Sequence, residues 1–376
     1  MGIEINPGNV APPPPVTVES GQTQAPSRKR KKKLVRRQAL DRSQQIRRGF
    51  QIAFLLLNVW LGGQFYLWVR QFEVAGSPIS VGRPAGVEGW LPIAGLMNLK
   101  YWLTTGHIPA IHPAAMFLLL AFLSMALLFR KAFCSWLCPV GTISEYLWRA
   151  GRSMFGRNFT LPGWLDIPLR GLKYLLLGFF VWAVAGMSAE AIGSFMHSSY
   201  GLIAAVKMLD FFRFLGLTGL VVICLLAFGS LLIKNFWCRY LCPYGALLGL
   251  VSLASPIRIR RDAKACIDCA KCARACPASL PVDRLASVRS AECTGCMACV
   301  AACPAEGALN MSLPWMLELK KKRNRLPVWA MAAGIALIFL GLAGFAKVTG
   351  HWNSPVPHSV YQKLIPHASD VQHPMP

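Results

Sequence analysis

The chain alternates between long apolar runs and polar connections. The apolar runs lie at about 49–69, 112–130, 169–188, 215–233 and 327–347. Each is close to the roughly 20 residues that an α-helix needs to cross the hydrocarbon core of a bilayer. The pattern therefore predicts an all-α polytopic membrane protein with five transmembrane helices.

The distribution of Lys and Arg predicts the orientation of these helices. Basic residues are concentrated at 28–37, 130–173 and 234–326. Charged residues are sparse at 70–111, at 189–214 and after Gly350. Because loops on the cytoplasmic side of a membrane carry the excess of Lys and Arg, we expect the N-terminus and the connection 234–326 to be cytoplasmic and the C-terminal tail to be periplasmic.

The segments outside the spans differ in character. Residues 1–27 are rich in Pro, Gly and Thr, and we expect them to be disordered. The basic block at 28–37 directly precedes the first apolar run, which favours a cytoplasmic membrane anchor over a nucleic-acid patch. The outer-loop stretches 90–105 and 191–214 are too apolar for free loops, and they predict interfacial helices or re-entrant segments.

The connection before the last span carries a repeated cysteine motif. The spacing C-x2-C-x2-C-x3-C-P occurs at 266–277 and again at 293–304, and it is the pattern of bacterial two-cluster ferredoxins, in which the fourth Cys of each motif ligates the other cluster. The predicted ligands are Cys266, Cys269, Cys272 and Cys303 for one [4Fe-4S] cluster, and Cys293, Cys296, Cys299 and Cys276 for the other. Zinc and disulfides are the alternatives, but zinc sites favour two separated pairs and disulfides need an oxidising compartment.

A gapless internal repeat closes two of the apolar runs. Residues 127–141 (LLFRKAFCSWLCPVG) align with residues 231–245 (LLIKNFWCRYLCPYG). The repeat predicts a four-helix core built from two duplicated hairpins, related by a pseudo-two-fold axis along the membrane normal, plus a fifth helix. This symmetry would bring four cysteines face to face at the cytoplasmic surface: Cys134, Cys138, Cys238 and Cys242.

These four cysteines have several interpretations. Two Cys at i and i+4 lie on one face of a helix about 6 Å apart, within reach of a disulfide or a shared metal. The functional alternatives are a redox-active dithiol, a metal site and a relay for electrons, and the structural alternative is packing at two helix ends. Duplication of Cys and Pro in the same frame favours a functional role. Cys224, inside the fourth apolar run, is expected to be a buried structural thiol.

Histidines offer a further candidate site. His107 and His112 precede the second span on the outer side, and either could contribute to a quinol site. For the others solvent exposure is the simpler expectation: His197, His351, His358, His367 and His373. The sequence has no C-x-x-C-H haem motif, no G-x-G-x-x-G dinucleotide loop and no P-loop, so we expect no nucleotide to be bound or hydrolysed.

Composition agrees with the membrane assignment. The 376 residues are 54% hydrophobic and carry a formal net charge of +24. The basic residues lie beside apolar spans, so topology explains them and no nucleic-acid partner is expected. The predicted regions are a Pro-rich and basic cytoplasmic N-terminus at 1–48, a four-span membrane domain at 49–250, a cytoplasmic ferredoxin domain of small α+β type at 251–313, a fifth transmembrane helix at 327–347 and an external tail at 348–376.

The paired F/W-C-x3-C-P-x-G corners and the two-cluster segment together resemble a known family. They are similar to the membrane polyferredoxins of the NapH and MauN type and the C-terminal half of NosR, and more distantly to CcoG (FixG, RdxA), over about residues 49–312. The resemblance implies a multi-pass protein of the bacterial inner membrane that passes electrons between the quinone pool and a redox partner protein in respiration. The chain departs from the family in lacking the flavin domain of NosR and in adding a fifth span and the tail at 350–361.

Three functions remain as hypotheses. In the first, the chain is an electron-transfer component of a quinol dehydrogenase, with two [4Fe-4S] clusters and a quinol bound in the four-helix core. In the second, suggested by the resemblance to CcoG, it is a copper reductase or an assembly factor for a respiratory metalloenzyme, with Cys134, Cys138, Cys238 and Cys242 handling the metal. In the third, it is a scaffold that docks a maturing redox enzyme through its basic face.

Overall fold

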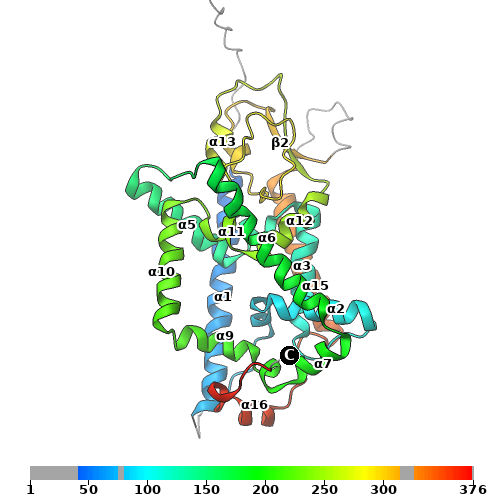
Figure 1. Cartoon of the computed structure of the whole chain (residues 1–376). Helices are drawn as coiled ribbons and strands as arrows, with labels where there is room; N and C mark the ends of the chain where they lie inside the picture. The colour runs from blue at the N-terminus through cyan, green and yellow to red at the C-terminus, as the bar shows by residue number, and fades with distance from the viewer. Residues whose placement is uncertain (1–40, 75–79, 314–325, 375–376) are drawn as a thin grey trace, which may run out of the picture. The chain divides into compact units, whose positions relative to one another are not determined.

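Each of the five apolar runs forms a helix (Figure 1). Three of these helices, α1 (Ser43–Glu73), α6 (Gly163–Gly186) and α15 (Val328–Val348), are long and apolar enough to cross a membrane. The other two are shorter, since α3 (Pro113–Phe129) has 17 residues and α10 (Leu217–Leu232) has 16. Among the described residues, three single helices therefore have the length and composition of a span, where the sequence predicted five.

The computed structural model describes residues 41–74, 80–313 and 326–374. The predicted disorder at 1–27, the basic anchor at 28–37 and the basic residues before the last span, within 314–325, lie outside these ranges. α1 already begins at Ser43, inside the region that the sequence assigned to the N-terminal extension. The first helix is therefore longer than the apolar run that predicted it.

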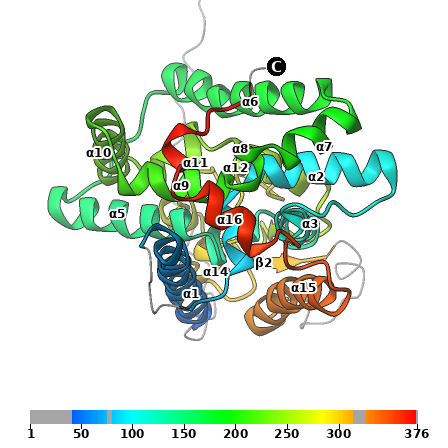
Figure 2. The ribbon, with the colours of Figure 1, turned by 90° about the horizontal axis from the view of Figure 1, so that it is seen from below.

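α3 occupies a central position among the helices. Most of its side chains are buried, and it contacts α15, α2 (Pro92–Thr105) and α12 (Pro243–Val251). In Figure 2 it lies between α15 and α6. A helix that is apolar on every side is expected in a protein core as well as in a bilayer. This explains why a buried helix has the sequence of a membrane span.

α10 is exposed along most of its length. Ser230 is its one buried residue, and α9 (Ala204–Arg213) precedes it at a bend of 82°, so that the two together make a fourth candidate span. Cys224 lies on α10 and is exposed, and the prediction of a buried structural thiol is therefore wrong. Apolar neighbours such as Leu225 are exposed as well. The sequence could not show this, because an apolar run that faces lipid and one that faces a protein core have the same composition.

The apolar stretches between the spans form short helices. They are η1 (Ala85–Trp90), α2, α7 (Ala189–His197), α8 (Ser199–Leu202) and α9. α2 packs against both α3 and α7. In the C-terminal tail, α16 (His358–Leu364) docks on the end of α1, and its Tyr361 ring lies 4.9 Å from the Trp68 ring. η4 (Ala368–Asp370) follows. The tail is thus packed against the helices.

The two repeated motifs fold into matching corners between helices. α4 (Ala132–Trp136) is followed by α5 (Pro139–Phe155), and α11 (Phe236–Tyr240) is followed by α12. α5 packs against α10, and α12 packs against α3. The helix after each corner therefore contacts the helix before the other corner, which is the packing expected of a two-fold relation between repeats.

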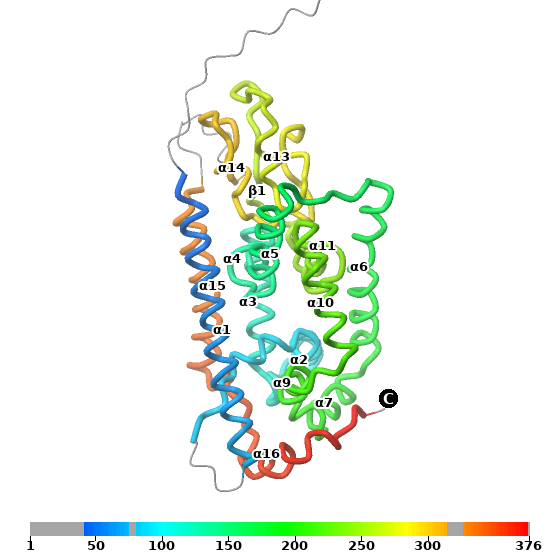
Figure 3. The backbone as a smooth tube through the Cα atoms, turned by 90° about the vertical axis from the view of Figure 1, so that its left-hand side faces the viewer, coloured from blue at the N-terminus to red at the C-terminus, as the bar shows by residue number. Residues whose placement is uncertain are grey.

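The cysteine-rich segment forms a small unit at one end of the helices (Figures 1 and 3). It begins after η2 (Ser252–Ala254) with β1 (Arg258–Arg261), which pairs antiparallel with β2 (Leu309–Ser312). The short helices α13 (Lys271–Ala275) and α14 (Ala298–Ala301) lie between the strands in sequence. α1 and α15 run side by side toward this segment (Figure 3), in contact through the rings of Phe54 and Phe339.

Candidate metal centres and membrane cavity

Each of the two predicted cluster ligand sets surrounds its own small hollow. One hollow is lined by Cys266, Cys269, Cys272 and Cys303. The other is lined by Cys276, Cys293, Cys296 and Cys299. The fourth cysteine of each motif therefore lies with the first three of the other motif. Four thiols around a hollow are the donor set that a cubane iron–sulfur cluster requires, so these residues fit the group.

The backbone of the two loops turns in the same way around these hollows. Asp268 and Ala270 in the first motif have φ values of 53° and 54°, and Gly295 and Met297 at the equivalent positions of the second have 63° and 56°. Left-handed residues alternating with right-handed ones aim successive N–H groups into a concavity, as at many iron–sulfur sites. The repeated geometry gives both thiol sets the same supply of backbone donors.

The two loops differ in their exposure. The second loop is buried against the helices, because Ser135 Oγ donates to the Thr294 carbonyl at 2.7 Å and Gln44 Nε2 donates to the Cys296 carbonyl at 3.0 Å. A Cβ on Gly295 would lie 3.0 Å from the Phe129 carbonyl. In the first loop, by contrast, Asp268 is 76% exposed. The ligand set containing Cys296 thus lies next to the helices, and the other set is closer to solvent.

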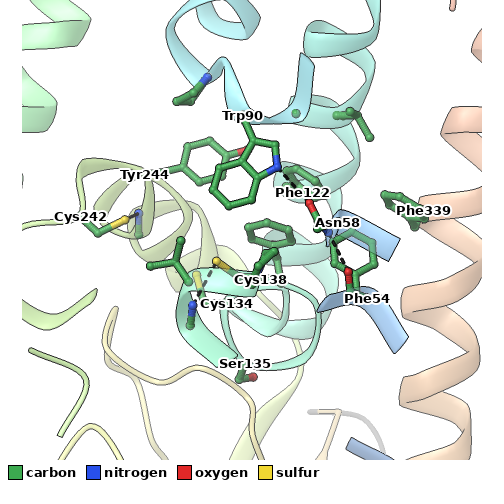
Figure 4. A pocket seen from close by; sticks show the side chains of 18 of the residues that line it. Phe54, Asn58, Trp90, Phe122, Cys134, Ser135, Cys138, Cys242, Tyr244 and Phe339 are labelled. Carbon is green, nitrogen blue, oxygen red and sulfur yellow. Dashed lines mark hydrogen bonds between the residues drawn. The ribbon is translucent and has the colours of Figure 1, made fainter. Parts of the chain in front are cut away.

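A cavity of about 820 Å³ extends from the helices to the second loop. Figure 4 shows side chains of α1, α3, α15 and η1 around it, with Phe54, Phe122 and Phe339 among them. Its lining includes Lys347, near the C-terminal end of α15, and residues of the ferredoxin segment, including Cys296. The cavity therefore joins the interior of the helices to one ligand set.

Three polar side chains give this apolar cavity specific hydrogen-bonding groups. Trp90 Nε1 donates to Asn58 Oδ1 at 3.0 Å, and Asn58 Nδ2 donates to the Phe54 carbonyl at 2.8 Å (Figure 4). Tyr244 also lines the cavity, and burial together with the nearby thiols raises the pKa of its hydroxyl well above the usual value. The Tyr244 hydroxyl therefore stays protonated and can act as a donor.

All four cysteines of the repeated corners line the cavity at its ferredoxin end: Cys134, Cys138, Cys238 and Cys242. The structure thus brings the two corners together at one cavity, as the repeat predicted. The local geometry differs from the predicted i, i+4 face of one helix, because α4 ends at Trp136 and Cys138 is the N-cap of a new helix, with φ −58° and ψ 119°. Pro139 at the first position of α5 disfavours a helical conformation for the residue before it.

In each corner the second cysteine accepts a hydrogen bond from the backbone of the following glycine. Gly141 N–H donates to Cys138 Sγ at 3.5 Å, and Gly245 N–H donates to Cys242 Sγ at 3.2 Å. A Cβ on Gly141 would collide with the carbonyl of Cys134. In both corners the sulfur thus caps the helix N-terminus, where the positive end of the helix dipole favours a thiolate. Burial acts in the other direction and raises the pKa of the Cys138 thiol to about 11.

Buried charges surround the corner thiols. Glu292, also in the cavity lining, lies 2.6 Å from Lys173 Nζ and 4.0 Å from Lys131 Nζ. Burial raises the pKa of Glu292, but the two lysines outweigh this effect and hold it below its usual value. Arg47, which also lines the cavity, makes a two-pronged ion pair with Glu145, with distances of 2.7 and 2.6 Å. The lysines outnumber the carboxylate beside the thiols, so this end of the cavity is positively charged.

The two histidines proposed for a quinol site are not part of the cavity lining. His107 is exposed. His112 is buried, with Nδ1 3.1 Å from Glu88 Oε1 and Nε2 2.8 Å from the Gly201 carbonyl. Among the described residues, which include all thirteen cysteines, no disulfide is formed, and no three His, Cys, Asp or Glu side chains are placed to hold a single metal ion.

The sequence did not point to several groups that shape the cavity: Asn58, Trp90, Lys131, Lys173, Tyr244 and Glu292. Two of them had a local signal. Tyr244 is the variable residue of the second C-P-x-G motif, where the first copy has Val140, and Glu292 directly precedes a predicted ligand. The others come from distant parts of the chain and meet only in the folded protein.

These features define a membrane protein that binds iron–sulfur clusters, and comparisons with known proteins agree. Residues 111–162 and 215–261, which contain the two corners, match a family described as "4Fe-4S binding domain". Residues 258–304 match a family described as "4Fe-4S dicluster domain". No solved structure is significantly similar.

Curated relatives identify the family. The chain is 52% identical to "Putative electron transport protein YccM" of Escherichia coli (strain K12), over 87% of this chain and 91% of the relative. It is 23% identical to ferredoxin-type protein NapH of the same organism, over 60% of this chain and 71% of NapH. It is 25% identical to the methylamine utilization ferredoxin-type protein MauN of Methylobacillus flagellatus, over 39% of this chain and 48% of MauN. The chain belongs to this family of membrane-bound ferredoxin-type proteins, and its role is iron–sulfur electron transfer.

Proposed function

We propose that this protein oxidises a quinol in the membrane cavity and supplies the electrons, through its ferredoxin segment, to a respiratory partner protein. The observation that carries the proposal is the continuity of the cavity, which is lined by Lys347 near the C-terminal end of α15 and by Cys296 in the ferredoxin segment. Quinol oxidation releases electrons as well as protons. The cavity ends beside Cys296, a predicted ligand of a cluster that would accept the electrons.

The size and shape of the cavity support a quinol. Its volume of about 820 Å³ lies within the range of roughly 300–1,000 Å³ common for small-molecule sites. On α1 its lining extends from Arg47 to Gln64, which corresponds to about 25 Å at the helical rise of 1.5 Å per residue. A cavity that is long and largely apolar suits a molecule with a polar ring and a hydrocarbon tail.

The polar groups of the cavity support a position for the quinol ring. The Tyr244 hydroxyl, kept protonated by burial, donates a hydrogen bond to a ring oxygen near the corner thiols. Trp90, held by Asn58, covers the ring, and Phe122 and Phe339 contact the tail. These groups support a position of the reacting end of the quinol at the ferredoxin side of the cavity.

The ferredoxin segment holds the clusters of the proposed function. Two ligand sets surround the two hollows, one near the cavity and one near solvent. When bound, each [4Fe-4S] cluster accepts or donates one electron at a time. The chain contributes the thiolates, the left-handed turns that direct N–H groups at sulfur, and the difference in burial between the loops. The exposed first loop, where Ile267 is 42% exposed, is the side at which a redox partner would dock.

Cluster reduction by quinol tests the function. Anaerobically purified protein in lipid is expected to lose its visible iron–sulfur absorption when a ubiquinol or menaquinol analogue is added, and the amount lost is compared with full reduction by dithionite. Protein-free vesicles with the same quinol are the control. If dithionite reduces the protein completely while neither quinol reduces it, quinol oxidation is ruled out.

Reporter fusions test the membrane orientation. We expect a fusion after Pro314 to be cytoplasmic and a fusion after Pro366 to be periplasmic, because Lys and Arg are concentrated in the connection before α15 and are sparse after it. α15 has the 21 residues that crossing requires. If both reporters were found on the same side of the membrane, α15 would not be a span and the docked tail would be cytoplasmic.

A further inference from the structure

A buried group of three ionisable side chains lies behind the part of the cavity wall that η1 forms: Arg83, Glu88 and His112. Glu88 is 0% exposed and His112 is 1% exposed. Arg83 Nη1 donates to Glu88 Oε1 at 2.8 Å, and His112 Nδ1 lies 3.1 Å from the same oxygen. Arg83 lines the cavity, whereas Glu88 and His112 do not. Arg83 therefore connects a buried carboxylate–imidazole pair to the space proposed for the quinol.

The His112 ring has hydrogen-bond partners in two protonation states. Nε2 lies 2.8 Å from the Gly201 carbonyl oxygen, which can only accept, so Nε2 carries a proton in both states. Nδ1 faces two groups of opposite kind, the acceptor Glu88 Oε1 at 3.1 Å and the donor Arg83 Nη2 at 3.4 Å. A protonated Nδ1 donates to Glu88, and a deprotonated Nδ1 accepts from Arg83. The ring can therefore gain and lose a proton at Nδ1 without moving.

The Glu88 carboxylate favours the protonated ring. Burial raises the pKa of the Glu88 carboxyl, but His112 and Arg83 outweigh this effect and hold the pKa below its usual value. Its second oxygen, Oε2, is buried and has no hydrogen-bond partner among the residues that the structure describes. Burial of a carboxylate is costly unless a positive charge lies beside it. A proton on His112 Nδ1 supplies such a charge directly next to Glu88.

Aromatic rings and neutral groups enclose the rest of this site. The Arg83 guanidinium carbon lies 5.9 Å from the centre of the Trp68 ring of α1 and 6.0 Å from that of the Tyr361 ring of α16. The C-terminal tail also reaches the histidine, since the His112 backbone N–H donates to Ser354 Oγ at 3.1 Å. Burial raises the pKa of the Tyr361 hydroxyl, so this tyrosine stays neutral. His112 is therefore the group of this site that changes its charge near neutral pH.

We propose that His112, held in place by Glu88, is the site through which protons released by the quinol leave the cavity. The inference rests on the proposed function, because the oxidised quinol supplies these protons. Each quinol loses two electrons and two protons and becomes a quinone. The two electrons pass to the ferredoxin segment, which has ligands for two one-electron centres. The two protons move one at a time to Nδ1 and on to solvent, carried past Arg83 by water, because a guanidinium does not give up its own proton.

Nitrogen-15 NMR of histidine in the full-length protein tests the proton site without quinol. The His112 signals are those lost in His112→Asn, since Asn tolerates the left-handed backbone of this residue, with φ 53°. The ring is expected to keep Nε2 protonated and to take up a second proton at Nδ1 between about pH 5 and 8. Glu88→Gln removes the anion that stabilises the protonated ring, so the midpoint of uptake is expected to fall by about one to three pH units.

A matched control is available on the same side of the helices. Glu190 lies in the first turn of α7 and is exposed. Glu190→Gln makes the same chemical change away from His112, and it is expected to leave the midpoint of proton uptake unchanged.

The pH dependence of quinol-dependent cluster reduction tests the role of the site. A deprotonated Nδ1 accepts the proton, so the wild-type rate at saturating quinol is expected to rise with pH through the midpoint found by NMR. In Glu88→Gln this rise is expected to move to lower pH by the same amount. His112→Asn is expected to lower the saturated rate by about 100-fold, with the half-saturating quinol concentration and complete reduction by dithionite unchanged. A histidine that only packs would instead reduce the dithionite-reducible fraction and leave the pH profile in place.

Three results would overturn the proposal. They are a neutral His112 ring with its proton on Nδ1, a midpoint that Glu88→Gln does not move, and a rate profile that does not follow the midpoint. The two experiments also separate this inference from the proposed function. Normal quinol-dependent reduction with a pH profile independent of Glu88 would remove only the inference. A protein that quinol cannot reduce, but in which His112 titrates as expected, would remove the proposed function and the role inferred from it.

Discussion

Ala343→Trp is expected to raise the quinol concentration needed for half-maximal cluster reduction by about 10- to 100-fold. Ala343 lies on α15 and lines the cavity, so an indole at this position occupies the space assigned to the quinol. Overpacking of a filled site costs about 1–3 kcal/mol, and about 1.4 kcal/mol corresponds to a tenfold change in affinity. The measurement is the initial rate of absorbance loss as a function of quinol concentration, normalised to bound iron.

A matched control lies ten residues earlier on the same helix. Ala333 is exposed and does not line the cavity, so Ala333→Trp is expected to leave both the rate and the quinol concentration dependence unchanged. Reduction by dithionite should be complete in both variants, because neither residue is a predicted cluster ligand. Equal quinol dependence in the two tryptophan variants would place the quinol outside this cavity.

The grouping of the eight ferredoxin cysteines could be predicted from the sequence because it follows from the spacing of the two motifs. The spacing within each motif fixes which thiols can share a centre, and the hollows lined by Cys272 and by Cys299 contain the sets that the spacing predicted. The gapless repeat likewise predicted that the corners meet. The helix break before Cys138 was missed, because two Cys at i and i+4 fit one continuous helix as well as they fit a corner.

The cavity could not be predicted, because apolar side chains that face lipid, a protein core or a ligand have the same sequence signature. Phe54, Trp90 and Phe339 line it from three separate elements. The basic residues were also ambiguous. Arg130 and Lys131 counted toward the orientation signal, yet both are buried, and Arg130 donates to the carbonyls of Ser252 and Ser290. Charge counts cannot distinguish a loop lysine from one that is buried beside a carboxylate inside the protein.

The second large effect is expected from the order in which electrons reach the two ferredoxin ligand sets. Cys299→Ser removes a ligand from the set next to the helices, and it is expected to cost about four irons. It should also abolish quinol-dependent reduction of the remaining set, which contains Cys269. The reason is position, since the loop from Ser290 to Cys296 contacts the corners and the cavity, while the Cys269 loop has no part in the cavity lining.

The reciprocal variant separates position from general damage. Cys269→Ser is expected to lose the same amount of iron, about four per chain, and to keep quinol-dependent reduction of the set near the cavity at the wild-type rate. Electron paramagnetic resonance of quinol-treated samples, with dithionite-treated samples as the reference for total reducible iron, distinguishes the two variants. Because both changes remove one thiol of a four-thiol set, an equal loss of quinol-dependent reduction would show that position does not matter. Retention of that reduction in Cys299→Ser would mean that electrons enter the ferredoxin segment by a route other than the loop docked on the corners.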